Sequence, residues 1–183
     1  PHRVFGIMPS DPHDGAFGRA VKKARELGFS ARVLAQDMRL VEPLQAARVY
    51  SEIARTVEKA GSVASPPCVL LSAGEMTVRV GEETGVGGRN QEFVLAVAQD
   101  RRGIAGSPSI VVASVDTDGT DGPGSRQPAE LADMPACLAG GIVDGHTMSE
   151  AAHAGVDISD GLDRSHTSPD LWKIRRWFHL KAG

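Results

Sequence analysis

The chain lacks most features that identify secreted, membrane or zinc-binding proteins. It has two cysteines in 183 residues, Cys68 and Cys137. Cys68 lies within an apolar run, which favours buried thiols in a reducing compartment over a disulfide. No stretch of 18 apolar residues and no basic-then-apolar leader is present, which predicts a cytoplasmic protein without a membrane partner. The six histidines show no metal-ligand spacing, so zinc is not expected.

Several motifs of nucleotide-binding proteins and hydrolases are also missing. No Walker loop, complete dinucleotide fingerprint or Gly-x-Ser-x-Gly elbow is found. The net charge of −3 gives no electrostatic reason to bind nucleic acid. Aromatic residues make up only 4%, but 41% hydrophobic and 23% charged residues are typical of a globular domain with a core of small aliphatic side chains.

Apolar periodicity predicts alternating strands and helices. Glycines and prolines interrupt the pattern, and Gly74 is placed as a tight reversal between two strands. The expected strands are 4–8, 32–35, 68–72, 76–80 and 109–115, and the expected helices are 16–27, 44–59, 91–99 and 147–154. This alternation predicts a three-layer α/β/α sandwich with a mixed, mainly parallel sheet.

A glycine-rich turn precedes the expected helix 91–99. It contains Gly87 and Gly88, where a backbone can approach a ligand closely, followed by Arg89. Free N–H groups at a helix N-terminus and a guanidinium together suit a phosphate or carboxylate. The alternative is structural: Arg89 could pair with Glu75 or Glu92. The next residues have the same ambiguity, because Asn90 could cap the helix and Glu92 could interact with its dipole.

An acidic turn follows the expected strand 109–115. Asp116, Asp118 and Asp121 alternate with glycine and threonine. Carboxylates on a turn suit Mg²⁺, which uses one or two of them together with phosphate oxygens. A solvated turn is the alternative. A calcium-binding hand does not fit, because its twelfth position is Gln127 instead of glutamate.

These two runs occur in a fixed order with two others. The four runs are Ala73–Val78, Gly87–Glu92, Thr117–Pro123 and Ala139–Gly145. Together they resemble the C-terminal domain of the glycerate 2-kinase family, called the MOFRL family. The resemblance implies transfer of a phosphoryl group from ATP to the 2-hydroxyl of D-glycerate, with Mg²⁺ at the nucleotide phosphates.

The same resemblance implies roles for individual residues. Arg89 would be catalytic, holding the substrate carboxylate or the moving phosphoryl group, and Asp118 and Asp121 would bind metal. The substrate-binding residues would be Glu75, Gly87, Gly88, Asn90, Gln91, Glu92 and Asp116.

The chain also departs from this family. The family's larger N-terminal domain, with its catalytic lysine, is not in the sequence, and the chain begins with Pro1, which we interpret as a fragment or processed product. We expect a MOFRL-like domain over 1–164 with an inserted loop at 124–138, and a divergent or truncated tail over 165–183 that lacks the final strand. A partner bearing the N-terminal domain is expected, and the chain alone is expected to be inactive. A hydroxypyruvate reductase, a label that relatives carry, and a noncatalytic remnant stay open as alternatives.

Overall fold

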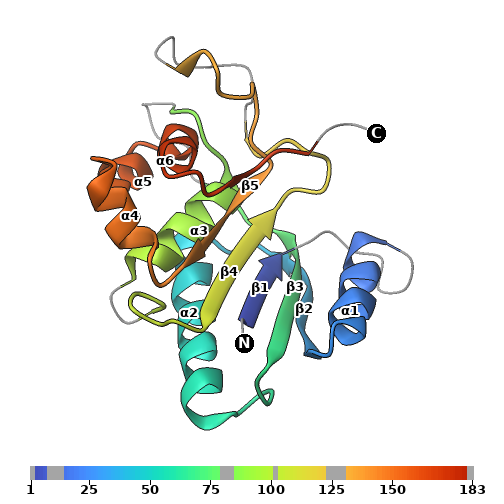
Figure 1. Cartoon of the computed structure of the whole chain (residues 1–183). Helices are drawn as coiled ribbons and strands as arrows, with labels where there is room; N and C mark the ends of the chain where they lie inside the picture. The colour runs from blue at the N-terminus through green and yellow to red at the C-terminus, as the bar shows by residue number, and fades with distance from the viewer. Residues whose placement is uncertain (1–2, 8–14, 79–84, 101–102, 123–130, 181–183) are drawn as a thin grey trace.

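The computed structural model describes residues 3–7, 15–78, 85–100, 103–122 and 131–180, which form one mixed sheet flanked by helices (Figure 1). Within these residues the sheet has six strands in the order β2-β3-β1-β4-β5-β6. The strands are β1 (Arg3–Ile7), β2 (Ser30–Arg39), β3 (Cys68–Glu75), β4 (Ile110–Val115), β5 (Gly140–Asp144) and β6 (Trp177–Phe178). Strands β1 to β4 run parallel, whereas β5 is antiparallel to β4 and β6 is antiparallel to β5. The predicted mainly parallel sheet is confirmed.

Helices cover both faces of the sheet. Helix α1 packs on one face, and the other helices pack on the opposite face (Figure 1). The bounds are α1 (Ala16–Glu26), α2 (Pro43–Ala60), α3 (Arg89–Gln99), α4 (Thr147–His153), α5 (Ile158–Asp163) and α6 (Thr167–Lys173). Strand β3 is buried between the two layers: Leu70 joins the large core under α2 and α3, while Leu71 joins the small core under α1. The three-layer sandwich is therefore confirmed.

Helix α2 forms where the sequence pattern predicts it. Its apolar side chains recur every three or four residues, and Ala46, Tyr50, Ala54 and Val57 are all buried. Proline in its first turn suits a helix start, and Gly61 ends it in the left-handed conformation with a φ of 64°. The helix thus presents one apolar stripe to the sheet.

The expected reversal at Gly74 is wrong. Strand β3 continues through Gly74 to Glu75, and residues 76–78 form no strand; residues 79 and 80 of the expected strand 76–80 lie outside the described part. A Cβ atom on Gly74 would lie 2.3 Å from the backbone of Met38. The glycine therefore permits close approach of β2 and β3 and makes no turn.

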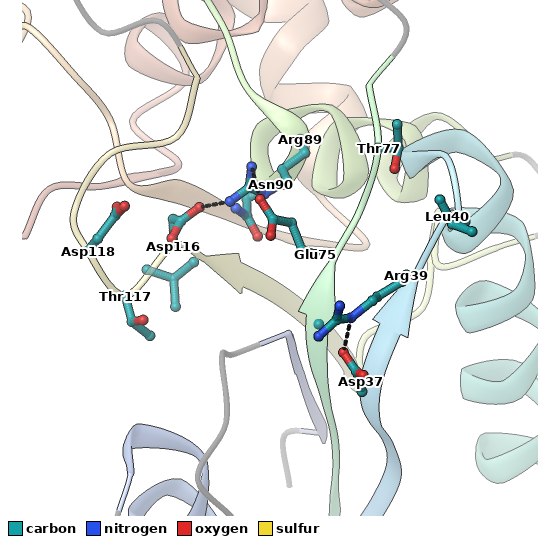
Figure 2. A pocket seen from close by; sticks show the side chains of 12 residues that line it. Asp37, Arg39, Leu40, Glu75, Thr77, Arg89, Asn90, Asp116, Thr117 and Asp118 are labelled. Carbon is teal, nitrogen blue, oxygen red and sulfur yellow. Dashed lines mark hydrogen bonds and ion pairs between the residues drawn. The ribbon is translucent and has the colours of Figure 1, made fainter.

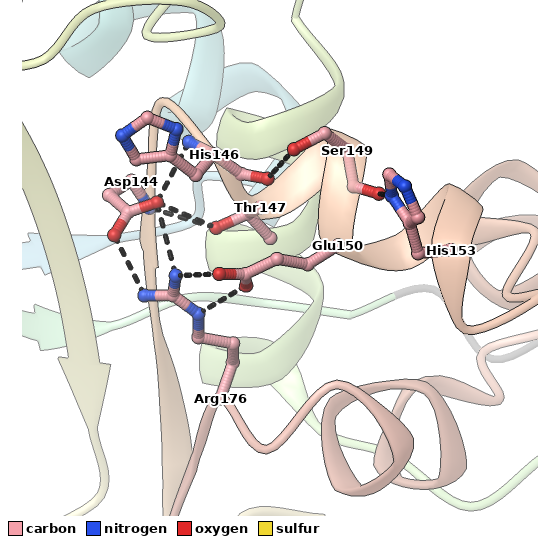
Figure 3. Close-up of polar contacts among 7 residues, drawn as sticks. All are labelled: Asp144, His146, Thr147, Ser149, Glu150, His153 and Arg176. Carbon is pink, nitrogen blue, oxygen red and sulfur yellow. Dashed lines mark hydrogen bonds and ion pairs between the residues drawn. The ribbon is translucent and has the colours of Figure 1, made fainter.

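The end of the chain carries a strand that the sequence analysis did not expect. Residues of β6 pair with β5 at the edge of the sheet. Arg176, which precedes β6, donates to Asp144 at the end of β5 (Nη1 to Oδ2, 2.8 Å) and to Glu150 on α4 (Nη2 to Oε1, 2.7 Å) (Figure 3). The end of the chain therefore carries a two-residue strand, and the part-buried Arg176 guanidinium links it to β5 and α4. That the family's own final strand is missing stays a prediction.

The expected inserted loop is partly described. Residues 131–138 pass over the core, and within them Met134 and Leu138 are almost fully buried; residues 124–130 lie outside the described part. The division into a domain over 1–164 and a tail stays a prediction. Both cysteines are free thiols, Cys68 buried and Cys137 half-buried. No helix among the described residues has the length and apolar character to cross a membrane.

Candidate functional site

A hollow of about 620 Å³ lies at the carboxyl ends of the parallel strands β2, β3 and β4 (Figure 2). This edge is where open α/β sheets usually bind ligands. Of the residues predicted to form the site, five line the hollow: Glu75, Arg89, Asn90, Asp116 and Asp118. Glu75 ends β3, Arg89 begins α3, and the two aspartates follow β4. The fold therefore brings together residues separated by up to 43 positions in the sequence.

Arg89 lies between two carboxylates. Its Nη2 group donates to Oδ2 of Asp116 at 2.6 Å, and its Nη1 group lies 3.3 Å from Oε1 of Glu75. The Asp116 side chain is 9% exposed and that of Glu75 is 74% exposed, so the first pair is shielded and the second is open to solvent. Burial raises the pKa of Asp116 above its usual range, whereas the Arg89 guanidinium lowers it. As far as the described residues show, these contacts use two of the five N–H donors of the Arg89 guanidinium.

Asp121 occupies the N-terminus of α3. Its Oδ1 accepts from the backbone N–H of Asn90 at 3.1 Å and its Oδ2 from that of Gln91 at 2.9 Å. Asp121 is only 2% exposed. The expectation of free N–H groups at this helix end is therefore wrong for these two residues, because the anion they bind is the chain's own carboxylate. Both oxygens of Asp121 accept hydrogen bonds in this way, and Asp121 does not line the hollow; the metal role expected for it stays a prediction.

The glycines of the first turn do not line the hollow: Gly88 packs against the acidic turn, and Gly87 packs against Thr167 and Ser165 at the start of α6. A Cβ atom on Gly88 would lie 2.4 Å from Asp121, and one on Gly122 would lie 1.8 Å from the carbonyl oxygen of Gly87. Gly122 also has a φ of 89°, which favours glycine. Gly87 and Gly88 were expected to bind substrate. The structure places them in a close contact between the two turns, and their substrate role stays a prediction.

The polar residues after Arg89 are mostly structural. Gln91 is fully buried, donates to the Asp121 carbonyl and accepts from Ser168. Glu92 is 5% exposed, and burial raises its pKa. Neither lines the hollow, so their expected substrate contacts are not supported. Asn90 does line it, although its amide group contacts Asp121 and Ser114.

One wall of the hollow was not predicted from the sequence. Asp37, Arg39 and Leu40 line it from the end of β2, and Thr77 and Thr117 line it elsewhere. The available signal was a pair of opposite charges at the end of a strand neighbouring β3. Among the described residues no group of three or more His, Cys, Asp or Glu side chains is placed to hold a metal ion. Asp118 is exposed at the rim, where its Oδ1 accepts from the N–H of Thr120.

The fold and the hollow define an α/β domain with a polar hollow at the carboxyl edge of its sheet, the edge at which ligands of open α/β sheets usually bind. Residues 68–180 match the MOFRL family, and the chain belongs to that family. This region includes β3, α3, the acidic turn and β6, so it contains most of the hollow.

Several proteins of known sequence or structure are similar to the chain. It is 32% identical to a glycerate 2-kinase of Pyrococcus horikoshii over 84% of this chain and 31% of that protein. It is 34% identical to a D-glycerate 2-kinase of Thermotoga maritima over 73% of this chain and 28% of that protein. The crystal structure of a glycerate kinase from Thermotoga maritima superposes with a TM-score of 0.75 and 29% identity, covering 89% of this chain and 35% of that one. The chain thus spans about a third of the length of these relatives.

Proposed function

We propose that the chain is the C-terminal part of an ATP-dependent glycerate 2-kinase, which converts D-glycerate and ATP to 2-phosphoglycerate and ADP. The names of its relatives support this reaction. We further propose that a second domain completes the cleft, because those relatives are about three times as long. The chain alone would then bind ligands without turning them over.

The observation that carries the proposal is the position of Arg89 in the hollow. Its guanidinium is held by Asp116 and Glu75 and retains N–H donors for phosphoryl oxygens. Phosphoryl transfer depends mainly on positioning and on stabilising negative charge. A fixed guanidinium at the edge of the sheet meets both needs, since its position does not have to be organised during the reaction.

Asp118 is the described carboxylate that fits a Mg²⁺ ion best. It is exposed at the rim of the hollow, on the same side as Arg89 (Figure 2). One or two carboxylates with phosphate oxygens and water suffice for this ion. When bound with ATP, Mg²⁺ neutralises phosphate charge. Asp116 is less suited to this role because Arg89 already occupies one of its oxygens.

A complementation assay tests the proposal. The chain alone should release no ADP from Mg-ATP and D-glycerate, whereas the chain joined to the N-terminal domain of the Thermotoga maritima relative should do so. Arg89→Ala in the joined protein should lower the rate about 30- to 1000-fold, which corresponds to about 2–4 kcal/mol. Arg32→Ala, on the same sheet but outside the hollow, is the matched control.

Two outcomes would count against the proposal. Turnover by the chain alone at roughly 1 to 10³ per second would refute the need for a second domain. A joined protein that folds and binds ATP but phosphorylates no glycerate would refute the kinase assignment.

A further inference from the structure

A second guanidinium faces the hollow from the strand neighbouring β3. Arg39 is the last residue of β2, and its backbone lies opposite Glu75 in the register of the two strands. Its side chain is 73% exposed, whereas that of Arg89 is 30% exposed. Figure 2 shows Arg39 and Arg89 on different walls of the same hollow.

Asp37 orients this arginine. The two residues are separated by two positions on one strand, so their side chains project from the same face. Nε of Arg39 donates to Oδ1 of Asp37 at 2.6 Å. Within the described part of the chain, no hydrogen-bond partner is found for the two Nη groups of Arg39. Arg39 therefore presents a pair of donors that can bind a carboxylate through two parallel hydrogen bonds.

Leu40, which follows Arg39 at the rim of the hollow, has an unusual backbone conformation. Leu40 has a φ of 57°, a conformation uncommon for residues other than glycine, and its side chain is 89% exposed. It lines the hollow beside Arg39. A strained and exposed apolar residue at the edge of a polar hollow is typical of functional segments, where local strain concentrates.

The two arginines differ in the carboxylates that surround them. Arg89 contacts two carboxylates and lies on the side of Asp118, where a phosphoryl group and its metal would be placed. Among the described residues, the Arg39 guanidinium hydrogen-bonds only Asp37, which raises the pKa of Arg39, and the Glu75 carboxylate adds a weaker electrostatic attraction in the same direction. The hollow therefore offers one place for a phosphoryl group and another for a carboxylate.

We propose that Arg39, oriented by Asp37, binds the carboxylate of the small hydroxy acid, while Arg89 faces the phosphoryl group. This inference rests on the proposed kinase function and assigns the orientation of the substrate. A molecule that carries a carboxylate at one end and a phosphate at the other would contact both walls at once.

Calorimetric titration of the 183-residue chain tests this orientation with three probes. These are 2-phosphoglycerate, which has both groups, D-glycerate, which has only the carboxylate, and inorganic phosphate. Arg39→Ala should weaken the binding of 2-phosphoglycerate and of D-glycerate about tenfold or more, because a pair of charge-assisted hydrogen bonds contributes at least about one factor of ten in affinity. The same variant should change the affinity for inorganic phosphate less than about twofold. Arg39→Lys, which retains the charge but not the paired donors, should restore only part of the affinity.

Arg32→Ala and Arg89→Ala serve as the controls for this titration. Arg32→Ala, on the same strand and away from the hollow, should leave all three affinities unchanged, and Arg89→Ala should weaken phosphate binding. If Arg39→Ala matches Arg32→Ala while Arg89→Ala still weakens binding, the inference fails and the kinase proposal stands. A loss of phosphate affinity in Arg39→Ala would reverse the orientation and refute the inference. If the unaltered chain binds none of the probes, both proposals fail.

Discussion

Replacement of Asp121 by alanine should destabilise the protein severely, although this residue looks like a metal ligand in the sequence. Its carboxylate accepts three hydrogen bonds, from the backbone N–H groups of Asn90 and Gln91 and from the Asn90 amide, at 2.9 to 3.1 Å. The side chain is buried, so water cannot replace it without rearrangement. Hydrogen bonds to a charged group contribute about 1.5–3 kcal/mol each, and buried N–H groups without a partner add a penalty.

Because such contributions are not additive, we expect a total loss of about 3–5 kcal/mol in the free energy of unfolding. For a chain of this size, that loss lowers the melting temperature by about 6–20 °C. Urea unfolding followed by circular dichroism gives the free energy directly. If the alanine variant does not fold, Asp121→Asn, which retains one acceptor oxygen, should lose about 1–3 kcal/mol and remain measurable.

The matched control lies in the same turn. Asp118 is exposed and accepts one hydrogen bond from the N–H of Thr120, so Asp118→Ala should cost less than about 1 kcal/mol. Equal losses for Asp118→Ala and Asp121→Ala would refute the reasoning. A loss below about 1 kcal/mol for Asp121→Ala would refute it as well, because the N–H groups of α3 would then be satisfied in another way.

Three further variants test other parts of the structure. Burial raises the pKa of Asp170 from 3.8 to about 6, so the folded state favours the protonated form and stability falls as the pH rises between these values. Asp170→Asn should therefore stabilise the protein at pH 7, by at most about 3 kcal/mol. Because burial also raises the pKa of Glu92 and Asp116, the variant should reduce, and not abolish, the fall in stability from pH 4 to 7; a fall as steep as in the unaltered chain would contradict the assignment. Arg176→Ala leaves the carboxylates of Asp144 and Glu150 without their partner and should lower the free energy of unfolding by about 2–4 kcal/mol. Arg175 is exposed, so Arg175→Ala should lower it by less than about 1 kcal/mol; similar losses for the two variants would mean that the contacts of Arg176 contribute little. Gly122→Ala should cost more than about 2 kcal/mol by thermal unfolding, since its Cβ would overlap the Gly87 carbonyl, and a milder loss would show that the two turns can separate.

Much of the fold could be predicted because its signals are local. The apolar stripe of α2, the buried run of β3 and the glycine that ends α2 each depend on residues within a few positions of one another. The two-residue strand β6 gives no such signal. It pairs with β5, and Arg176 just before it joins two carboxylates that are 26 and 32 positions earlier in the chain.

The site was predictable in part for the same reason. Arg89 and Asp116 stand directly beside a helix start and a strand end, and such positions meet at one edge of a parallel sheet. Asp37 and Arg39 were missed because β2 extends to residue 39, four residues beyond the apolar run that marks it. The strand continues there by pairing with β3, through a register shift that no local pattern indicates.

The glycine-rich turn has the composition of an anion-binding loop, and the structure explains why that interpretation was half right. The N-terminus of α3 does bind an anion, but that anion is Asp121, 30 positions later than Gln91. Gly88 and Gly122 let the two turns approach within backbone contact, and Arg89 directly follows this contact as the first residue of α3. The same composition thus serves to pack the start of α3, where Arg89 stands, against the acidic turn. A loop that bound phosphate through its own backbone would need those N–H groups free, which the buried carboxylate excludes.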